Sequence, residues 1–322
     1  MLLLGSLFVI DNDSSPKHAK AAIAPELPRV YLDTTYPTLS SNRTIRNVRS
    51  SCSGFTNCTT SLQTAIDQAN QGDEIVVQAG MTITGPITLR NKTTGSGWIV
   101  IRTSNMSGIP PAGTRVGPQH ASAMPRMVAP GNSGYAIQTE NNAHHYRLVG
   151  LEVTENANDD SNVLIQLGNN DSQCATSTEP YRVCDPSVLS TYAHHFVLDR
   201  MYIHGLPTHN IRRGVEMNSK EAAVIDSYIS EIHVVGQDNQ AIAGTNGPGP
   251  YKIVNNYLEG AAENVMFGGD DPRVRDLMPS DIEIRNNHFN KPLTWRRGDP
   301  SFNGRAWQVK NLLLGSSATK VD

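Results

Sequence analysis

The 322-residue sequence has no large excess of charge of either sign. Its 27 Lys and Arg residues and 30 Asp and Glu residues give a formal net charge of −3, and they are mixed along the chain. No basic stripe or arginine-rich run occurs, so we expect no nucleic-acid partner. Hydrophobic residues make up only 38% of the chain, which favours short strands with many exposed turns over a helical bundle.

Long apolar runs are missing as well, apart from MLLLGSLFVI at the start. This run is long enough for the core of a signal peptide and too short to span a membrane. The small-residue stretch AKAAIA at 19–24 follows it. We therefore predict a targeting segment at 1–24, a secreted protein (extracellular or periplasmic) and no membrane span.

Cysteine is scarce, and the four cysteines form two close pairs, Cys52 with Cys58 and Cys174 with Cys184. Both pairs lie in turn-rich segments without histidine. Neither has the C-x-x-C or Cys/His spacing that is typical of zinc sites. We predict two local disulfides, and these favour an oxidising compartment.

What the sequence does contain is a repeat. Five segments follow one strand-like template, and those after the first end 50, 26, 29 and 31 residues further along the chain. Repeats of this size are typical of a solenoid, in which each coil buries its apolar side against its neighbours. The five segments are YRLVGLEV (146–153), FVLDRMYI (196–203), AAVIDSYI (222–229), YKIVNNYL (251–258) and IEIRNNHF (282–289).

A second strand-like piece follows each copy. Most of these pieces alternate apolar and other residues, as a strand with one buried face does. They lie at 162–167, 213–218, 241–245, 264–268 and 308–312. The residues predicted to point inward are Val163, Val215, Ile242, Val265 and Val309. Those predicted to point outward are Leu164, Glu216, Ala243, Met266 and Lys310. The doublets Asn255-Asn256 and Asn286-Asn287 suit tight corners and an internal Asn ladder.

The segment before the repeats has its own pattern. Residues 25–60 are rich in Pro, Ser, Thr and Asn, which indicates an irregular leading segment. Ser61 is a suitable N-cap for a helix whose apolar face contains Leu62 and Ile66, and a strand follows at 74–78. A short amphipathic helix at this point would shield the open end of a solenoid.

The order of LQTAIDQANQGDEIVVQAG (62–80), TITGPITL (82–89) and GWIVIRT (97–103) resembles the opening of right-handed parallel β-helix proteins of the pectin-lyase-like superfamily. The predicted fold is therefore all-β, a right-handed single-stranded parallel β-helix over 61–322 with a short N-terminal capping helix. The sequence is still apolar in pattern near its last residues. We therefore expect that the solenoid is truncated there or associates through that end.

The resemblance implies a polysaccharide ligand, while subfamily motifs such as G-H-G and W-x-D-H are absent. β-Elimination in an acidic polysaccharide needs a base for the C5 proton and cations that stabilise the enolate. The densest set of such groups is HGLPTHNIRRGVE (204–216). The candidate catalytic residues are Arg212, Arg213, Glu216, His209 and Lys310. The candidate substrate-binding residues are His204, Asn218, Lys220, Asp238, Glu263 and Asn264.

Other groups leave alternatives open. Asp270 and Asp271 could bind Ca²⁺, or supply a carboxylate to a glycoside hydrolase together with Glu263 or Glu216, although a plain Asp-Pro turn is favoured. A non-catalytic polysaccharide-binding or surface protein is a third possibility. No cofactor is certain, and the oligomeric state stays open.

Two histidine doublets, His144-His145 and His194-His195, precede template copies at the same offset. Repetition at one structural position indicates a corner role, so the sequence gives no reason for a metal site there.

Overall fold

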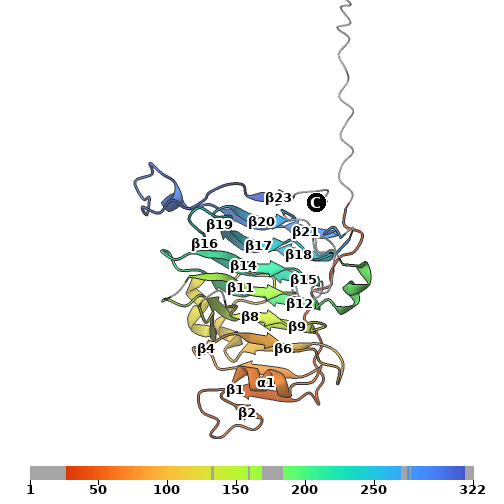
Figure 1. Cartoon of the computed structure of the whole chain (residues 1–322). Coiled ribbons are helices and arrows are strands. Elements are labelled where there is room, and N and C mark those ends of the chain that lie inside the picture. The colour runs from red at the N-terminus through yellow and green to blue at the C-terminus, as the bar shows by residue number, and fades with distance from the viewer. Residues whose placement is uncertain are drawn as a thin grey trace, which may run out of the picture.

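The computed structural model describes residues 27–131, 134–158, 160–168, 184–269, 274–275 and 277–315, which form three parallel sheets (Figure 1). The predicted targeting segment at 1–24 lies outside the described residues, as do Cys174, Asp270 and Asp271. Among the described residues, no helix is both long enough and apolar enough to cross a bilayer. The architecture is the parallel β-helix that the sequence predicts.

Each complete coil contributes one strand to each sheet. In spatial order, the first sheet contains β2 (Cys58–Thr59), β1 (Ile45–Val48), β3 (Glu74–Val77), β6 (Ile99–Thr103), β9 (His144–Val149), β12 (His194–Asp199), β15 (Lys220–Ile225), β18 (Gly249–Val254) and β21 (Ile282–Arg285). The second contains β22 (His288–Asn290), β19 (Tyr257–Gly260), β16 (Tyr228–Ile232), β13 (Tyr202–His204), β10 (Glu152–Thr154), β7 (Arg126–Val128) and β4 (Thr82–Thr84). The third contains β23 (Leu313–Gly315), β20 (Glu263–Phe267), β17 (Gln240–Gly244), β14 (Ile211–Met217), β11 (Ser161–Leu167), β8 (Ile137–Thr139) and β5 (Ile87–Leu89).

Helical structure in the described residues is short. The α-helix α1 spans Leu62–Gln68. The 3-10 helices are η1 (Met106–Gly108), η2 (Pro118–Ala123), η4 (Pro186–Thr191) and η5 (Leu293–Trp295).

The template found in the sequence corresponds to a strand of the first sheet, a sharp corner and a strand of the second sheet. In the first sheet, Val224 pairs with Ile253, which pairs in turn with Ile284. In the second sheet, Ile229 pairs with Leu258. Because side chains at equivalent positions stack on the next coil, apolar columns form the core. The predicted repeat and its register are confirmed here.

The predicted register of the third sheet is wrong in one coil. Val215 pairs with Ile165, so Val163 lies opposite Arg213. Leu164, which we expected to point outward, is fully buried and packs in the main core with Ile165. Two successive residues therefore face inward, and the strict period of two on which the prediction relied fails at this bend.

The last predicted strand is also displaced. The strand β23 is Leu313–Gly315, and residues 308–312 precede it. Val309 is 45% exposed and does not enter the core. Lys310 is not part of a strand, so it does not continue the predicted outward column. The residue that pairs with Met266 is Leu314 instead.

The predicted helix is present. The Ser61 hydroxyl accepts a hydrogen bond from the Thr64 backbone N–H, at 3.2 Å, as an N-cap does. Leu62, Ala65 and Ile66 are buried in the main core. The first sheet nevertheless continues past β3 into β1 and β2, so residues 25–60 contain strands as well as the irregular structure that we predicted.

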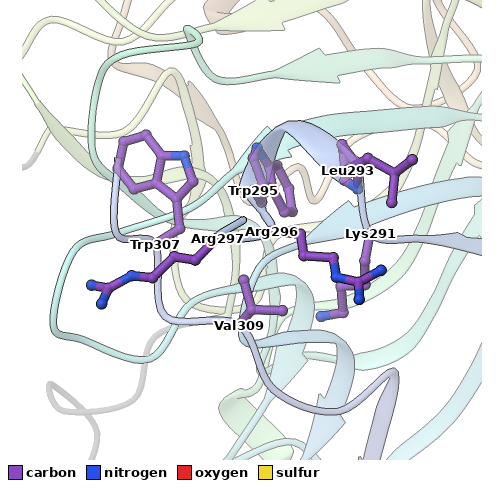
Figure 2. A pocket seen from close by; sticks show the side chains of 8 residues that line it. Lys291, Leu293, Trp295, Arg296, Arg297, Trp307 and Val309 are labelled. Carbon is purple, nitrogen blue, oxygen red and sulfur yellow. The ribbon is translucent and has the colours of Figure 1, made fainter. Parts of the chain in front are cut away.

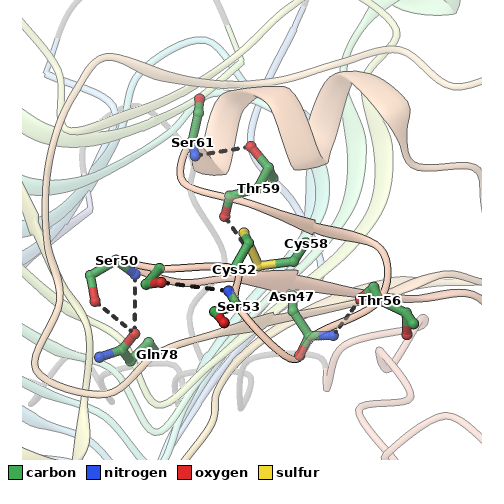
Figure 3. The surroundings of a disulfide bond; sticks show 10 residues. Asn47, Ser50, Cys52, Ser53, Thr56, Cys58, Thr59, Ser61 and Gln78 are labelled. Carbon is green, nitrogen blue, oxygen red and sulfur yellow. Dashed lines mark hydrogen bonds between the residues drawn. A yellow bond between two sulfur atoms is a disulfide. The ribbon is translucent and has the colours of Figure 1, made fainter.

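A disulfide joins Cys52, in the loop after β1, to Cys58, the first residue of β2, which confirms the first predicted pairing (Figure 3). The Ser50 backbone N–H donates to the Gln78 side-chain oxygen at 3.1 Å beside this loop. The second pairing stays a prediction because Cys174 is not among the described residues.

The asparagine doublets form the internal ladder that we predicted. Asn255 and Asn286 adopt left-handed φ values of 58° and 57° at the corners between the first and second sheets. The Asn256 amide donates to the Asn287 side-chain oxygen at 3.0 Å and to the Val224 carbonyl at 2.8 Å. Each buried amide therefore bonds to a neighbouring coil, which is a structural role.

Residues 27–42 cross the outer face of the first sheet, and we call this segment the strap (Figure 1). The Arg29 backbone N–H donates to Asp281, just before β21, at 2.7 Å. Lys252 in β18 donates to the Leu32 carbonyl at 3.1 Å. Arg147 in β9 donates to the Thr34 carbonyl at 2.9 Å. The strap thus runs from the last coil of the first sheet toward the first one.

Candidate functional site

A row of polar side chains crosses the outer face of the third sheet. Arg213, Gln240 and Glu263 occupy equivalent positions in β14, β17 and β20. The Arg213 guanidinium donates to the Gln240 side-chain oxygen at 3.4 Å, and the Gln240 amide donates to Glu263 at 2.8 Å. Because these residues stack coil upon coil, the sequence repeat itself brings them into one line.

A second column runs beside this row. Glu216 forms an ion pair with Arg213 and accepts a hydrogen bond from the Gln166 amide at 3.2 Å. Gln166 also donates to the Tyr135 hydroxyl at 3.0 Å. Glu216 is 4% exposed and Glu263 1% exposed. Hydrogen bonds from their protein partners therefore replace the water that both carboxylates lose on burial. Arg213, Gln240, Glu216 and Glu263 thus form one hydrogen-bonded network.

Lys291, just after β22, lies at the end of the row. Its ammonium donates to the carbonyls of Gly260, Ala261 and Ala262 at 2.5, 2.7 and 2.9 Å. Burial lowers the pKa of Lys291 to about 8, while the nearby charge of Glu263 acts in the opposite direction. The side chain is therefore held in place yet can lose its proton close to neutral pH.

An open pocket of about 430 Å³ adjoins Lys291 (Figure 2). Figure 2 shows the indole of Trp307 on one side of it, with Lys291 and Arg296 on the other. Arg296 and Arg297 are exposed, whereas Trp295 and Trp307 are buried, with 3% and 6% of their surface exposed. The pocket therefore combines cationic groups with aromatic and apolar surface.

His233 packs against the indoles of Trp295 and Trp307. Its ring stacks on Trp307 at 3.8 Å between ring centroids and meets Trp295 edge-on at 5.3 Å. Its Nε2 lies 2.9 Å from the Glu231 carboxylate. A packed ring system of this kind limits the rotation of Trp307, which reduces the entropy that a ligand would have to overcome.

Two further predicted residues lie close to the pocket. Lys310 forms an ion pair with Asp238 at 2.5 Å, and Gln308 donates to the same carboxylate at 2.6 Å. The hydrogen bond to Asp238 raises the pKa of Lys310. Lys310 therefore stays charged at neutral pH, which makes it unsuitable as a base.

The segment 204–216 does not act as one cluster. His204 ends β13 in the second sheet, where it stacks on Tyr202 at 4.3 Å and lies 3.1 Å from Glu152. His209 lies in the loop before β14, and its Nδ1 is 3.9 Å from Glu155. Arg212 is half-buried in β14. Of the residues in this segment, Arg213 belongs to the row and Glu216 is paired with it from the neighbouring column.

Three predicted binding residues have structural roles instead. Asn218 is buried, and its side-chain oxygen accepts hydrogen bonds from the backbone N–H groups of Thr245 and Asn246, both at 2.9 Å. The Asn264 amide donates to the Leu258 carbonyl at 2.6 Å. Lys220 begins a strand of the first sheet and donates to the Leu189 carbonyl at 3.1 Å. The corner geometry directs these side chains at backbone groups.

Sequence reasoning missed the residues that shape the pocket. The run TWRRG at 294–298 places two arginines directly after a tryptophan in a loop, which was a usable signal. The TWRRG run lies beside Trp307 because of the path that residues 296–307 take. The spacing of residues in the sequence does not reveal that path. Gln240 was missed because a glutamine carries no charge.

The chain is a parallel β-helix protein. No family model matches it, and no curated protein is similar to it in sequence. Among solved structures, an alginate lyase from Paenibacillus sp. str. FPU-7 matches 70% of this chain and 70% of its own, with 17% identity and a TM-score of 0.39. Pectate lyase Pel9A matches 88% of this chain and 79% of its own, with 13% identity and a TM-score of 0.39.

A third solved structure is AlyGC, an alginate lyase of the PL6 family. It matches 90% of this chain and 41% of its own length, with 11% identity and a TM-score of 0.34. Likenesses at this level say nothing about activity, because one fold can support many functions.

Proposed function

We propose that this β-helix protein binds an acidic polysaccharide in the pocket beside Lys291 and along the outer face of the third sheet. The observation that carries the proposal is the meeting of Lys291, Arg296 and Arg297 with the indole of Trp307 in one open pocket. Guanidinium groups pair with carboxylates through two parallel hydrogen bonds. An indole offers a flat apolar face, which suits the apolar face of a sugar ring.

The geometry of the sheet favours an extended ligand. Neighbouring strands of a parallel sheet lie about 4.8 Å apart, so a groove that follows the stack presents a regular series of contacts. The row from Arg213 to Glu263 leads to Lys291 at the edge of the pocket. We place this activity outside the cell, which the disulfide between Cys52 and Cys58 supports.

Binding can be tested by titrating alginate and polygalacturonate, with dextran as a neutral control. The double variant Arg296→Gln/Arg297→Gln should weaken binding by about tenfold for each charge-assisted hydrogen bond lost. The matched control is Arg285→Gln, which changes an exposed arginine paired with Glu283 in the first sheet. Equal affinity of both variants and the unchanged protein would contradict the proposed pocket.

We further propose that the bound polymer is cleaved by β-elimination, with Lys291 as the base for the C5 proton. A neutral amine keeps two N–H donors for its carbonyl partners and gains a lone pair for the proton. Arg296 or Arg297 would stabilise the enolate charge. Since the base must be unprotonated, the rate should rise with pH through about 8, the pKa of Lys291.

Cleavage can be followed by the absorbance of the unsaturated product at about 235 nm. Lys291→Arg keeps a positive charge but cannot lose its proton, so it should abolish elimination while binding persists. Lys310→Arg should leave the rate unchanged. Reducing ends without this absorbance would indicate a hydrolase that uses Glu216 or Glu263. Binding without any product would indicate a non-catalytic binder.

A further inference from the structure

Four histidines and a glutamate gather where three coils enter the first sheet. His144 and His145 begin β9, and His194 and His195 begin β12 one coil later. His144 pairs with His194 in register, and Glu221 lies in β15 of the next coil. We call these five residues the histidine corner. It is separate from the polar row and from the pocket, which lie on the third sheet and beside it.

The nitrogen atoms of the histidine corner point at one another. The Nδ1 atoms of His194 and His195 lie 2.7 Å apart, and those of His144 and His145 lie 2.8 Å apart. A carboxylate oxygen of Glu221 lies 2.7 Å from Nδ1 of His195 and 3.7 Å from Nδ1 of His194. His145, His194 and His195 each offer a nitrogen within 4.8 Å of the other two.

The rings are held in this arrangement by stacking. His145 stacks on His195 at 4.3 Å between centroids, and His144 stacks on His194 at 4.9 Å. His145, His195 and Glu221 share left-handed φ values of 59°, 58° and 51°. Non-glycine residues adopt this backbone region at a cost, so its repetition in three successive coils requires support from the surrounding structure.

Protons alone satisfy this arrangement poorly. Only one proton can lie between two ring nitrogens, and Nδ1 of His195 faces both His194 and Glu221. Neutral imidazole is the form that binds metal ions.

We propose that the histidine corner binds one divalent transition-metal ion, with His145, His194 and His195 as imidazole ligands and Glu221 as the carboxylate ligand. Three nitrogens and one oxygen form a common donor set for zinc. With zinc–ligand bonds of about 2.05 Å, a tetrahedral site separates its ligand atoms by about 3.3 Å. The separations of 2.7, 2.7 and 3.7 Å among His194, His195 and Glu221 bracket that value, and a nitrogen of His145 lies within 4.8 Å of those of His194 and His195.

The surroundings suit an ion that arrives from solvent. The side chains of His194, His195 and Glu221 are 27%, 35% and 33% exposed. The Gln71 amide nitrogen lies 2.8 Å from Nδ1 of His144, the histidine outside the proposed ligand set. Hydrogen bonds and stacking around ligands orient them and increase metal affinity. Because the ligands come from three successive coils, a bound ion would also crosslink those coils.

The first test is equilibrium dialysis of the chelator-treated protein against Zn²⁺, with the metal content measured by mass spectrometry. We expect one zinc ion per chain, and an affinity at least 100-fold lower in His145→Gln/His195→Gln. The matched control is Asp160→Asn/His209→Gln, which changes the other group of histidine and carboxylates, that of Glu155, Asp160 and His209. Unchanged zinc binding in the first variant, or its loss only in the control, would overturn the proposal.

A second readout uses Trp98, whose ring lies 5.3 Å from that of His145. Ni²⁺ should quench the fluorescence of Trp98, and Trp98→Phe should remove this quenching while one metal ion still binds per chain. Ca²⁺ prefers oxygen ligands and should not compete. Circular dichroism of each variant establishes that it is folded. Quenching that survives in folded Trp98→Phe protein would place the metal elsewhere.

Discussion

The outer faces of the first and third sheets both carry buried charged groups, but these groups are satisfied in different ways. On the first sheet, Arg147 forms a buried ion pair with Asp199 at 2.7 Å and donates to the Thr34 carbonyl of the strap. On the third sheet, Arg213 is bonded to the side chains of Glu216 and Gln240. The strap therefore covers the outer face of the first sheet, whereas the row on the outer face of the third sheet ends near an open pocket.

The two faces therefore compensate their buried charges through different kinds of partner. The carbonyls of the strap cannot move without undocking the segment, so Arg147 and Asp199 have no freedom to receive a ligand. On the third sheet, Arg213 and Glu216 are paired within the sheet itself, so their charges are compensated without a covering segment. A buried charge is thus informative about function only when its partners are known.

The largest expected effect is on the first sheet. Among the described residues, Arg147→Met leaves buried Asp199 with Arg200 as its remaining ion-pair partner, at 2.7 Å. We expect the free energy of unfolding to fall by about 3–5 kcal/mol, measured by urea denaturation. Limited proteolysis should also show faster cleavage within the strap. A loss as small as that of Arg285→Met, at most about 1 kcal/mol for an exposed pair, would contradict the distinction.

The next largest effect tests the third sheet. Arg213→Met leaves Glu216 buried without its ion-pair partner and should lower the free energy of unfolding by about 3 kcal/mol. Arg213→Met/Glu216→Gln should recover much of this loss, because the uncompensated charge is removed. The strap should stay as resistant to proteolysis as in the unchanged protein. A double variant that is less stable than Arg213→Met would contradict the view that the uncompensated charge of Glu216 causes the loss of stability.

A smaller effect is expected at Lys252, which donates one hydrogen bond to the strap. Lys252→Met should lower the free energy of unfolding by about 1 kcal/mol and increase proteolysis at 27–42. Lys310→Met, which changes an exposed lysine near the pocket, is the control and should leave strap cleavage unchanged. Equal cleavage in all three proteins would mean that this contact does not hold the strap.

The smallest effect concerns pH. The pKa of Lys291 is lowered from 10.5 to about 8 by burial, so between these values the unfolded chain binds more protons than the folded one. The contribution of Lys291 to stability should therefore rise with pH from about 8 to about 10.5. Subtracting the pH profile of Lys291→Met from that of the unchanged protein isolates this rise. The arginines of the first sheet stay charged throughout and should add nothing.

Much of the fold could be predicted because the repeat reflects the stacking of coils directly. Positions such as Val224, Ile253 and Ile284 must be apolar in every coil, and their spacing fixes two of the three sheets. The third sheet was predicted less well, because the bend at Leu164 and Ile165 turns two neighbouring residues inward. The alternation of apolar and polar residues along a strand cannot reveal such a bend.

The candidate site was only partly predictable. Arg213 and Glu216 stood out because they lie on a repeated strand. Lys291 and Trp307 come together through a loop whose path depends on packing against His233. The histidine doublets were assigned to a corner, but sequence spacing could not show that left-handed backbone turns their rings toward one another.

The strap also has a consequence for the order in which the molecule assembles. The contact between Arg29 and Asp281 joins residues 252 positions apart in the sequence. Contacts between such distant residues close large loops and tend to form late in folding. In a nascent chain, the contact of Arg29 can form only after the coil that contains Asp281 has been made. Resistance of the strap to proteases would then report that the coils from β9 to β21 are in place.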